Sequence, residues 1–144
     1  MTAEELLKRY AAGERDFSKV KLSGIGEMLE GVDLKEINLS DSRINNLSFI
    51  GTNLSSANLR NTILGQTDFS GADLTGADLF QAGFRGADLT GADLTGADLS
   101  ETCFERANLS QTIFRNARDS DTNFMRAIFL DTIMPDGSIN NPSI

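Results

Sequence analysis

The chain of 144 residues contains no histidine, no tryptophan, one tyrosine and one cysteine. Without histidine, neither a Ser-His-Asp triad nor a Cys-His pair can form, and zinc sites built from histidine or from several cysteines are excluded as well. One cysteine cannot form an internal disulfide, which favours a reducing compartment, so we expect a cytoplasmic location. No apolar run approaches the ~18 residues of a membrane span, and residues 1–15 lack a signal-peptide core.

Basic residues are also scarce, since 13 Lys and Arg face 21 Asp and Glu and leave a net charge of −8. This balance argues against direct nucleic-acid binding, which needs a basic face. Residues 66–104 hold seven acidic residues against Arg85, a net charge of −6, whereas the rest of the chain sums to −2. We call six of these carboxylates the acidic belt: Asp68, Asp73, Asp78, Asp88, Asp93 and Asp98.

A period of five residues organises most of what is present. Every fifth residue from Leu34 to Ile144 is apolar in 22 of 23 cases, and Asp119 is the exception. The residue two places earlier is Ala or Thr in 17 of the 21 cases from Val32 to Thr132, and the residue between is Asp or Asn in 12 of them. A register held for over 100 residues without a slip predicts a repeat architecture.

The period fits neither the 3.6-residue turn of a helix nor the simple alternation of a long strand. Two residues separated by one point to the same side of an extended segment, so Ala and Leu face inward and the Asp or Asn between them faces outward. The other two positions are rich in Gly, Ser, Thr, Asn and Asp, which favour turns. Each repeat is therefore a short extended piece plus a corner, and only stacked coils can bury its apolar residue.

These repeats closely resemble the pentapeptide-repeat family, whose unit is A-(D/N)-L-X-X, most clearly in the GADLTGADL copies of residues 71–100. The resemblance covers residues 15–134 and points to small cyanobacterial members that begin with a capping helix. It implies an all-β fold, a right-handed quadrilateral parallel β-helix with four pentapeptides per coil. Residues 20 apart then stack, and they do segregate into leucine-rich and phenylalanine-rich columns. Six coils at about 4.8 Å each make a rod of roughly 29 Å.

Three segments are expected. Residues 1–14 form an N-terminal cap with a helix over 3–12, because Thr2 and Glu5 make a capping box and apolar residues follow at helical spacing. Residues 15–134 form the β-helix, with two extra residues around Ser23–Met28, and residues 135–144 form a tail. A membrane-surface role for the helix is disfavoured by its short apolar face.

The C-terminal end carries outward apolar residues that we call the C-terminal patch: Ile113, Met125, Ile128, Leu130 and Ile133. Exposed apolar patches often mark interfaces, and a homodimer through this end is one arrangement. The alternative is that the tail folds back over the patch, and the Pro135-Asp136-Gly137 turn suits either outcome. Asp119, the polar residue in the core register, is expected to reach water or a nearby arginine.

No catalytic, metal or cofactor site is expected. The carboxylates lie on outward faces of a regular rod that offers no cleft, and Cys103 has no base in its repeat. The sequence therefore favours a non-enzymatic scaffold or protein-interaction module whose partner is a protein and neither a membrane nor a nucleic acid. The resemblance implies one alternative, since some pentapeptide-repeat proteins mimic DNA and bind DNA gyrase. The acidic belt favours DNA mimicry. However, duplex DNA as long as the rod carries roughly 17 charges, whereas the whole chain has a net charge of −8.

Overall fold

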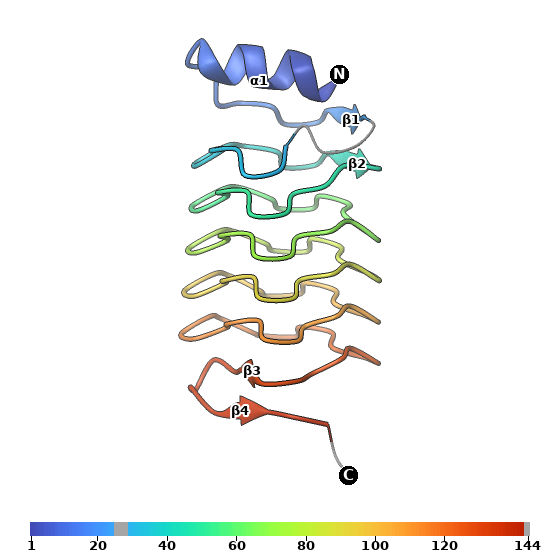
Figure 1. Cartoon of the computed structure of the whole chain (residues 1–144), viewed down its shortest axis with the longest axis vertical. Helices are drawn as coiled ribbons and strands as arrows, with labels where there is room; N and C mark the ends of the chain where they lie inside the picture. Colours follow the sequence, from blue (N-terminus) through green and yellow to red (C-terminus); the bar gives the residue numbers. More distant parts are fainter. Residues whose placement is uncertain (25–28, 143–144) are drawn as a thin grey trace.

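The computed structural model, which describes residues 1–24 and 29–142, is a stack of square coils (Figure 1). Parallel β-bridges join residues twenty apart, as in the series Asn58, Asp78, Asp98 and Arg118. The chain therefore advances one level after every four pentapeptides. The fold is the expected right-handed quadrilateral β-helix, closed at its start by a short helix.

Regular strands are short. β1 (Lys21–Ser23) and β2 (Arg43–Asn45) pair in parallel, while most other sides of the coil are joined through single-residue bridges. The reason is geometric, because each side contains only about three extended residues before the next corner. Backbone hydrogen bonds still join most levels of the coil, as from Leu54 N to Asp73 O and from Asp73 N to Thr52 O.

Each pentapeptide forms one side of a coil, so equivalent pentapeptides stack into four faces. We number the faces from the first regular coil: face 1 starts at residues 32–36, face 2 at 37–41, face 3 at 42–46 and face 4 at 47–51. Later members of a face follow at intervals of twenty residues, and β1 lies one level before β2 on face 3.

The first coil is two residues longer than the others. Lys21 pairs with Arg43 and Asp16 with Asn38, both 22 apart, whereas later partners are 20 apart. This is the expected insertion around Ser23–Met28, of which residues 25–28 lie outside the described part of the chain. Gly24 is described, and a Cβ there would approach Leu47 Cδ2 to 2.6 Å, so a larger residue would require the Leu47 side chain to shift.

The corner geometry explains which residue types occupy the fifth position of each repeat. The backbone φ is positive at this position in every repeat from Gly31 to Asp131. The amide of the next repeat's first residue bonds back across the corner, as from Ala57 N to Leu54 O. A positive φ at the third residue of such a four-residue turn is typical of type II turns, where glycine or asparagine is favoured. Gly71, Gly91 and Gly96 meet this requirement without strain.

The interior is filled by the first and third residues of the repeats, as expected. Ala97 and Leu99 are fully buried, while Asp98 between them is only half-buried. Where threonine replaces alanine, its hydroxyl mostly donates to a carbonyl of the preceding coil, as Thr102 does to Leu79 O at 2.7 Å, and Thr67 donates to Gly65 O instead. The core therefore accepts this polar group at no cost in unsatisfied hydrogen bonds.

Phenylalanines stack in two columns of the core. On face 3, the ring of Phe104 lies parallel to those of Phe84 and Phe124, with centroids 5.3 and 5.6 Å away. On face 4, Phe49 and Phe69 stack at 5.0 Å. Edge-on contacts join different columns, as from Phe104 on face 3 to Phe114 on face 1 at 5.8 Å. These spacings are those of favourable aromatic pairs.

Helix α1 (Ala3–Ala11) covers the first coil. The Thr2 hydroxyl accepts the amide hydrogen of Glu5 at 3.2 Å, which confirms the predicted N-cap. Ala3 and Leu6 are fully buried against the coil, and the Tyr10 hydroxyl donates to Lys35 O at 2.9 Å. The helix thus closes one end of the core with both apolar and polar contacts.

The opposite end is closed differently. After β3 (Thr132–Ile133), the chain turns at residues 134–137 and returns as β4 (Ile139–Asn140), antiparallel to β3. Ile139 keeps the five-residue period, yet it is exposed because the chain has left the coil. The described part of the tail pairs with β3 on face 1, and Asn141 Oδ1 accepts the amide hydrogen of Asp131 on face 4 at 2.7 Å.

Below neutral pH, stability is expected to fall only in acid. Hydrogen bonds from the Ser100 side chain and amide, with Arg118 and Arg60 nearby, lower the pKa of Asp98, and Ser138 does the same for the pKa of Asp136. A folded-state pKa below the unfolded one stabilises the fold above the unfolded pKa, and this stability is lost as the pH falls through the folded value. We therefore expect a constant Tm from pH 7 to 5 and a decline below about pH 4.

The dependence of Tm on pH is measured by thermal unfolding followed by circular dichroism at a series of pH values. The chain has no histidine, so no side chain has an ordinary pKa between 5 and 8. Asp98→Asn keeps an oxygen that can accept the Ser100 amide hydrogen but loses the charge. This variant should show a smaller fall in Tm in acid. A Tm that drops between pH 7 and 5 would contradict this account.

Candidate functional site

The described residues contain no group of three or more Asp, Glu, Cys or His side chains placed to hold a metal ion. None of their buried side-chain nitrogen or oxygen atoms lacks a hydrogen-bond partner. The helix in this part of the chain is too short to cross a bilayer. Three surfaces of the rod are candidates: the acidic belt, the C-terminal patch and face 3.

The aspartates of the acidic belt stack in three ladders, with bridges between Asp73 and Asp93, Asp78 and Asp98, and Asp68 and Asp88. The carboxylates of the belt also accept hydrogen bonds from the corner residues. Their outward position alone did not predict these bonds. Asp88 Oδ1 accepts the Thr90 amide at 2.9 Å and the Thr90 hydroxyl at 2.6 Å, and Asp68 makes the same pair of bonds to Ser70. The recurring Ser or Thr two residues after Asp was the signal for this local turn.

Part of the belt is paired with arginine on face 2. Arg60 Nη1 lies 3.1 Å from Asp78 Oδ2, and its guanidinium stacks 4.4 Å from the centroid of the Phe80 ring. Phe80, an outward aromatic, is thus partly covered by the chain itself. This cluster stabilises face 2 and leaves less free negative charge there than the sequence suggests.

The C-terminal patch contains both exposed and half-buried residues. Met125, Ile128 and Leu130 are 60%, 54% and 46% exposed. Ile113 and Ile133 stack on each other through a β-bridge on face 1 and are half-buried. The tail therefore leaves Met125, Ile128 and Leu130 accessible.

The coil end beneath this patch is only partly covered. Phe124, Ala127 and Phe129 are half-exposed, although the residues one coil earlier, Phe104, Ala107 and Leu109, are fully buried. Beside them, a hollow of about 400 Å³ opens between Ile128 and the tail at Asn140–Pro142. Asp119 lies at the same end and is exposed, as expected for a carboxylate in a core column.

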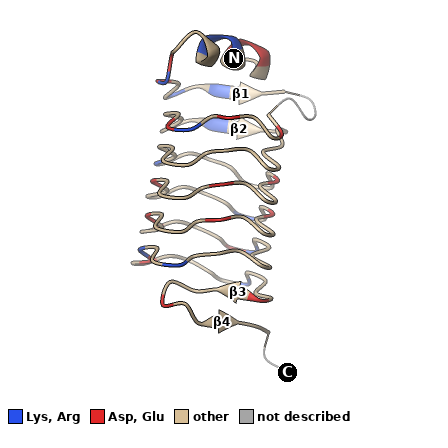
Figure 2. Cartoon of the chain, turned by 60° about the vertical axis from the view of Figure 1, so that its left-hand side comes forward, with Lys and Arg blue, Asp and Glu red and all other residues tan. Residues whose placement is uncertain are grey.

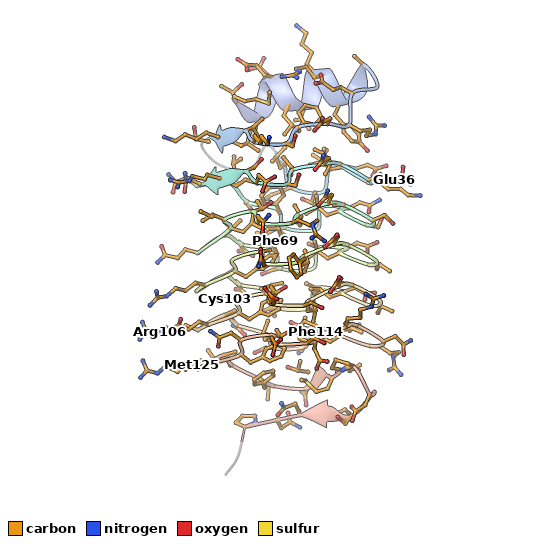
Figure 3. All side chains as sticks on the ribbon, turned by 180° about the vertical axis from the view of Figure 1, so that it is seen from behind. Glu36, Phe69, Cys103, Arg106, Phe114 and Met125 are labelled. Atoms are coloured by element: carbon orange, nitrogen blue, oxygen red, sulfur yellow. The ribbon has the colours of Figure 1, made fainter. Side chains whose placement is uncertain are left out.

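Face 3 differs from the other faces because it is basic. Its second positions, which elsewhere favour Asp or Asn, are Lys21, Arg43, Ile63, Gly83, Cys103 and Asn123. Arg85, Glu105, Arg106 and Arg126 occupy later positions of the same face. The face thus carries five cations and one carboxylate, a net charge of +4, so the rest of the chain carries −12. Figure 2 shows the basic residues of β1 and β2 on adjacent levels, and Figure 3 places Cys103 and Arg106 on this side.

The family model for pentapeptide repeats, which consists of eight copies of the repeat, matches residues 29–61, 52–91, 77–116 and 102–135. This chain is a pentapeptide-repeat protein. The match and the geometry agree, since matched segments advance through the same square coils. No curated protein sequence matches the chain significantly.

Solved structures of the family are similar to this pentapeptide-repeat protein. Rfr23 from the cyanobacterium Cyanothece 51142 is 22% identical, with a TM-score of 0.68 over 86% of this chain and 93% of its own. HetL from Nostoc sp. strain PCC 7120, described as involved in heterocyst differentiation regulation, is 24% identical, with a TM-score of 0.46 over 97% of this chain and 100% of its own. QnrB1, a plasmid-mediated fluoroquinolone resistance protein, is 20% identical, with a TM-score of 0.43 over 81% of this chain and 72% of its own. At these identities the likeness concerns the fold.

Proposed function

We propose that this pentapeptide-repeat protein is a non-catalytic protein-interaction module, a rigid scaffold that self-associates through its C-terminal patch. The observation that carries the proposal is the contrast between the two ends. Helix α1 closes the first coil, whereas Phe124 and Phe129 remain half-exposed beside the exposed Ile128 at the last. Burying such an apolar end is favourable at about 25 cal/mol per Å².

The self-association is tested with two matched isoleucines. Ile128 and Ile63 both occupy the second position of a repeat, where aspartate is common, and they are 54% and 50% exposed. Both Ile128→Asp and Ile63→Asp should therefore fold. We expect Ile128→Asp to weaken self-association at least tenfold, because it places a charge in the apolar end, while Ile63→Asp leaves it unchanged.

Sedimentation velocity across a concentration series provides the measurement. A wild-type chain that stays monomeric at all concentrations, or an Ile128→Asp variant that associates like the wild type, would refute association through this end. The scaffold role would then depend on the flat faces alone.

Mimicry of DNA toward DNA gyrase has weaker support. The acidic belt favours it, but several of its carboxylates are engaged in corner hydrogen bonds or paired with arginine. Face 3 carries a net charge of +4, which interrupts the uniform negative surface that mimicry of a duplex requires.

A further inference from the structure

We infer that face 3 is a docking surface for an extended acidic segment of a protein partner, with two carboxylates separated by an apolar side chain. The inference rests on the proposed protein-binding function and names the chemistry of one partner segment. The part of face 3 from Arg43 to Arg106 lies away from the coil end that carries the proposed self-association, and only the last level, with Met125 and Arg126, adjoins that end.

The cations of face 3 form two groups. Lys21 and Arg43 lie on the first two levels, whereas Arg85, Arg106 and Arg126 lie on the last three. Arg85 is 63% exposed and has Glu105 Oε1 at 3.6 Å. Among the described residues, no carboxylate lies within ion-pair distance of Arg43, Arg106 or Arg126. Face 3 thus has free positive charge at both ends.

The level between these two groups is apolar and hollowed. Ile63 is 50% exposed, and a depression of about 520 Å³ extends from it between Gly65, Gly86, Arg85 and Arg106. Gly83, at the second position of the next level, has open space where a Cβ would be. An apolar side chain fits this hollow, with guanidinium groups at its rim.

The spacing selects an extended peptide. Arg43 and Arg106 are three levels apart, about 14 Å along the rod at the usual strand separation. An extended chain covers this length in about four residues, and its residues i, i+2 and i+4 point to one side. Acidic residues at i and i+4 would reach the two cation groups, and an apolar residue at i+2 would meet Ile63 and the hollow.

Charge also limits the partner. The basic strip is one face wide and is flanked by the aspartates of face 2, such as Asp78 and Asp98, and of face 4, such as Asp68 and Asp88. A duplex is wider than one face and carries a charge about every 1.7 Å, so it would meet these carboxylates. A single acidic strand would not.

The probe is a fluorescein-labelled heptapeptide, Ser-Glu-Ser-Leu-Ser-Glu-Ser, titrated with full-length protein. The control peptide, Ser-Leu-Ser-Ser-Glu-Glu-Ser, has the same composition but adjacent glutamates. Fluorescence anisotropy is measured at about 10 mM salt, where the screening length is about 30 Å. We expect saturable binding of the first peptide, at least fivefold weaker binding of the second, and loss of affinity as salt is raised.

Gly83→Asp is the decisive variant. It installs the residue usual at this position of the repeat, where a Cβ meets nothing within 4 Å and φ is not left-handed, so the fold should be retained. We expect it to weaken binding of the first peptide at least tenfold. Asn108→Asp, the same charge change at the equivalent position of face 4, should alter binding less than twofold.

A second pair of variants is independent of the hollow. Arg43→Gln with Arg106→Gln removes two cations from face 3, and Lys35→Gln with Arg115→Gln removes two from face 1. Only the first pair should weaken binding. Equal binding of both peptides, equal effects of the matched variants, or tighter binding of single-stranded DNA of the same charge would overturn the inference. Ile128→Asp should retain peptide binding. A failure of the proposed self-association can therefore be distinguished from a failure of peptide docking on face 3.

Discussion

Phe104→Ala is expected to lower the free energy of unfolding by about 4 kcal/mol, the largest effect of any single core truncation in the phenylalanine columns. Phe104 is fully buried and is the ring with parallel neighbours on both sides, Phe84 and Phe124, and an edge-on contact to Phe114. Its removal leaves a cavity and breaks three aromatic pairs, each worth about 0.5–1.5 kcal/mol beyond burial. The coils cannot close this cavity, because their spacing is set by backbone hydrogen bonds.

Urea unfolding followed by circular dichroism measures the loss. Phe129→Ala is the matched control, because Phe129 is half-exposed and has one ring contact, to Phe124 at 5.7 Å. It should cost less than half as much. Phe104→Leu should cost under about 1.5 kcal/mol, since leucine fills the equivalent site in other columns. Equal losses for Phe104→Ala and Phe129→Ala would show that the interior column is not the main source of stability.

The fold could be predicted because each repeat repeats the same local rules. The inward alanine and leucine, the corner with positive φ and the twenty-residue columns all favour one architecture, and the exception in the core register, Asp119, is exposed at the end of the stack. The end of the coil was less predictable. Ile139 continues the period, but it is exposed after the turn at Pro135–Gly137, because the period records which residues would face inward and not where stacking stops.

The surfaces were harder to predict than the core. Arg43, Arg85 and Arg106 are scattered through an acidic sequence, and only the stacking of residues twenty apart brings them to one face. The net charge of −8 is an average over the whole chain, so it does not reveal that one face is basic. Listing the outward residues of every fourth repeat would have revealed face 3. The corner bonds of the belt, such as Asp88 to Thr90, are local and were visible in principle.

Leu6→Asp is expected to open the capped end of the rod and to lower the free energy of unfolding by more than about 3 kcal/mol. Leu6 is fully buried between helix α1 and the first coil, so the variant loses its apolar contacts and must bury or expose a carboxylate. The hydrogen bonds from Met1 N to Lys21 O and from Ser23 N to Met1 O would be released with the helix. β1 would then present unpaired edge groups, which favour association with other chains.

Leu7→Asp provides the control, because Leu7 is the next residue of the same helix but only half-buried, and it should cost less than about 1 kcal/mol. Urea unfolding gives the stability, and light scattering after size exclusion gives the mass. The two ends can be separated with the double variant of Leu6→Asp and Ile128→Asp. If the N-terminal cap protects an independent edge, this double variant still forms oligomers, whereas Ile128→Asp alone does not. Oligomers that vanish in the double variant would mean that all association uses the C-terminal end, and that α1 stabilises the rod without guarding its edge.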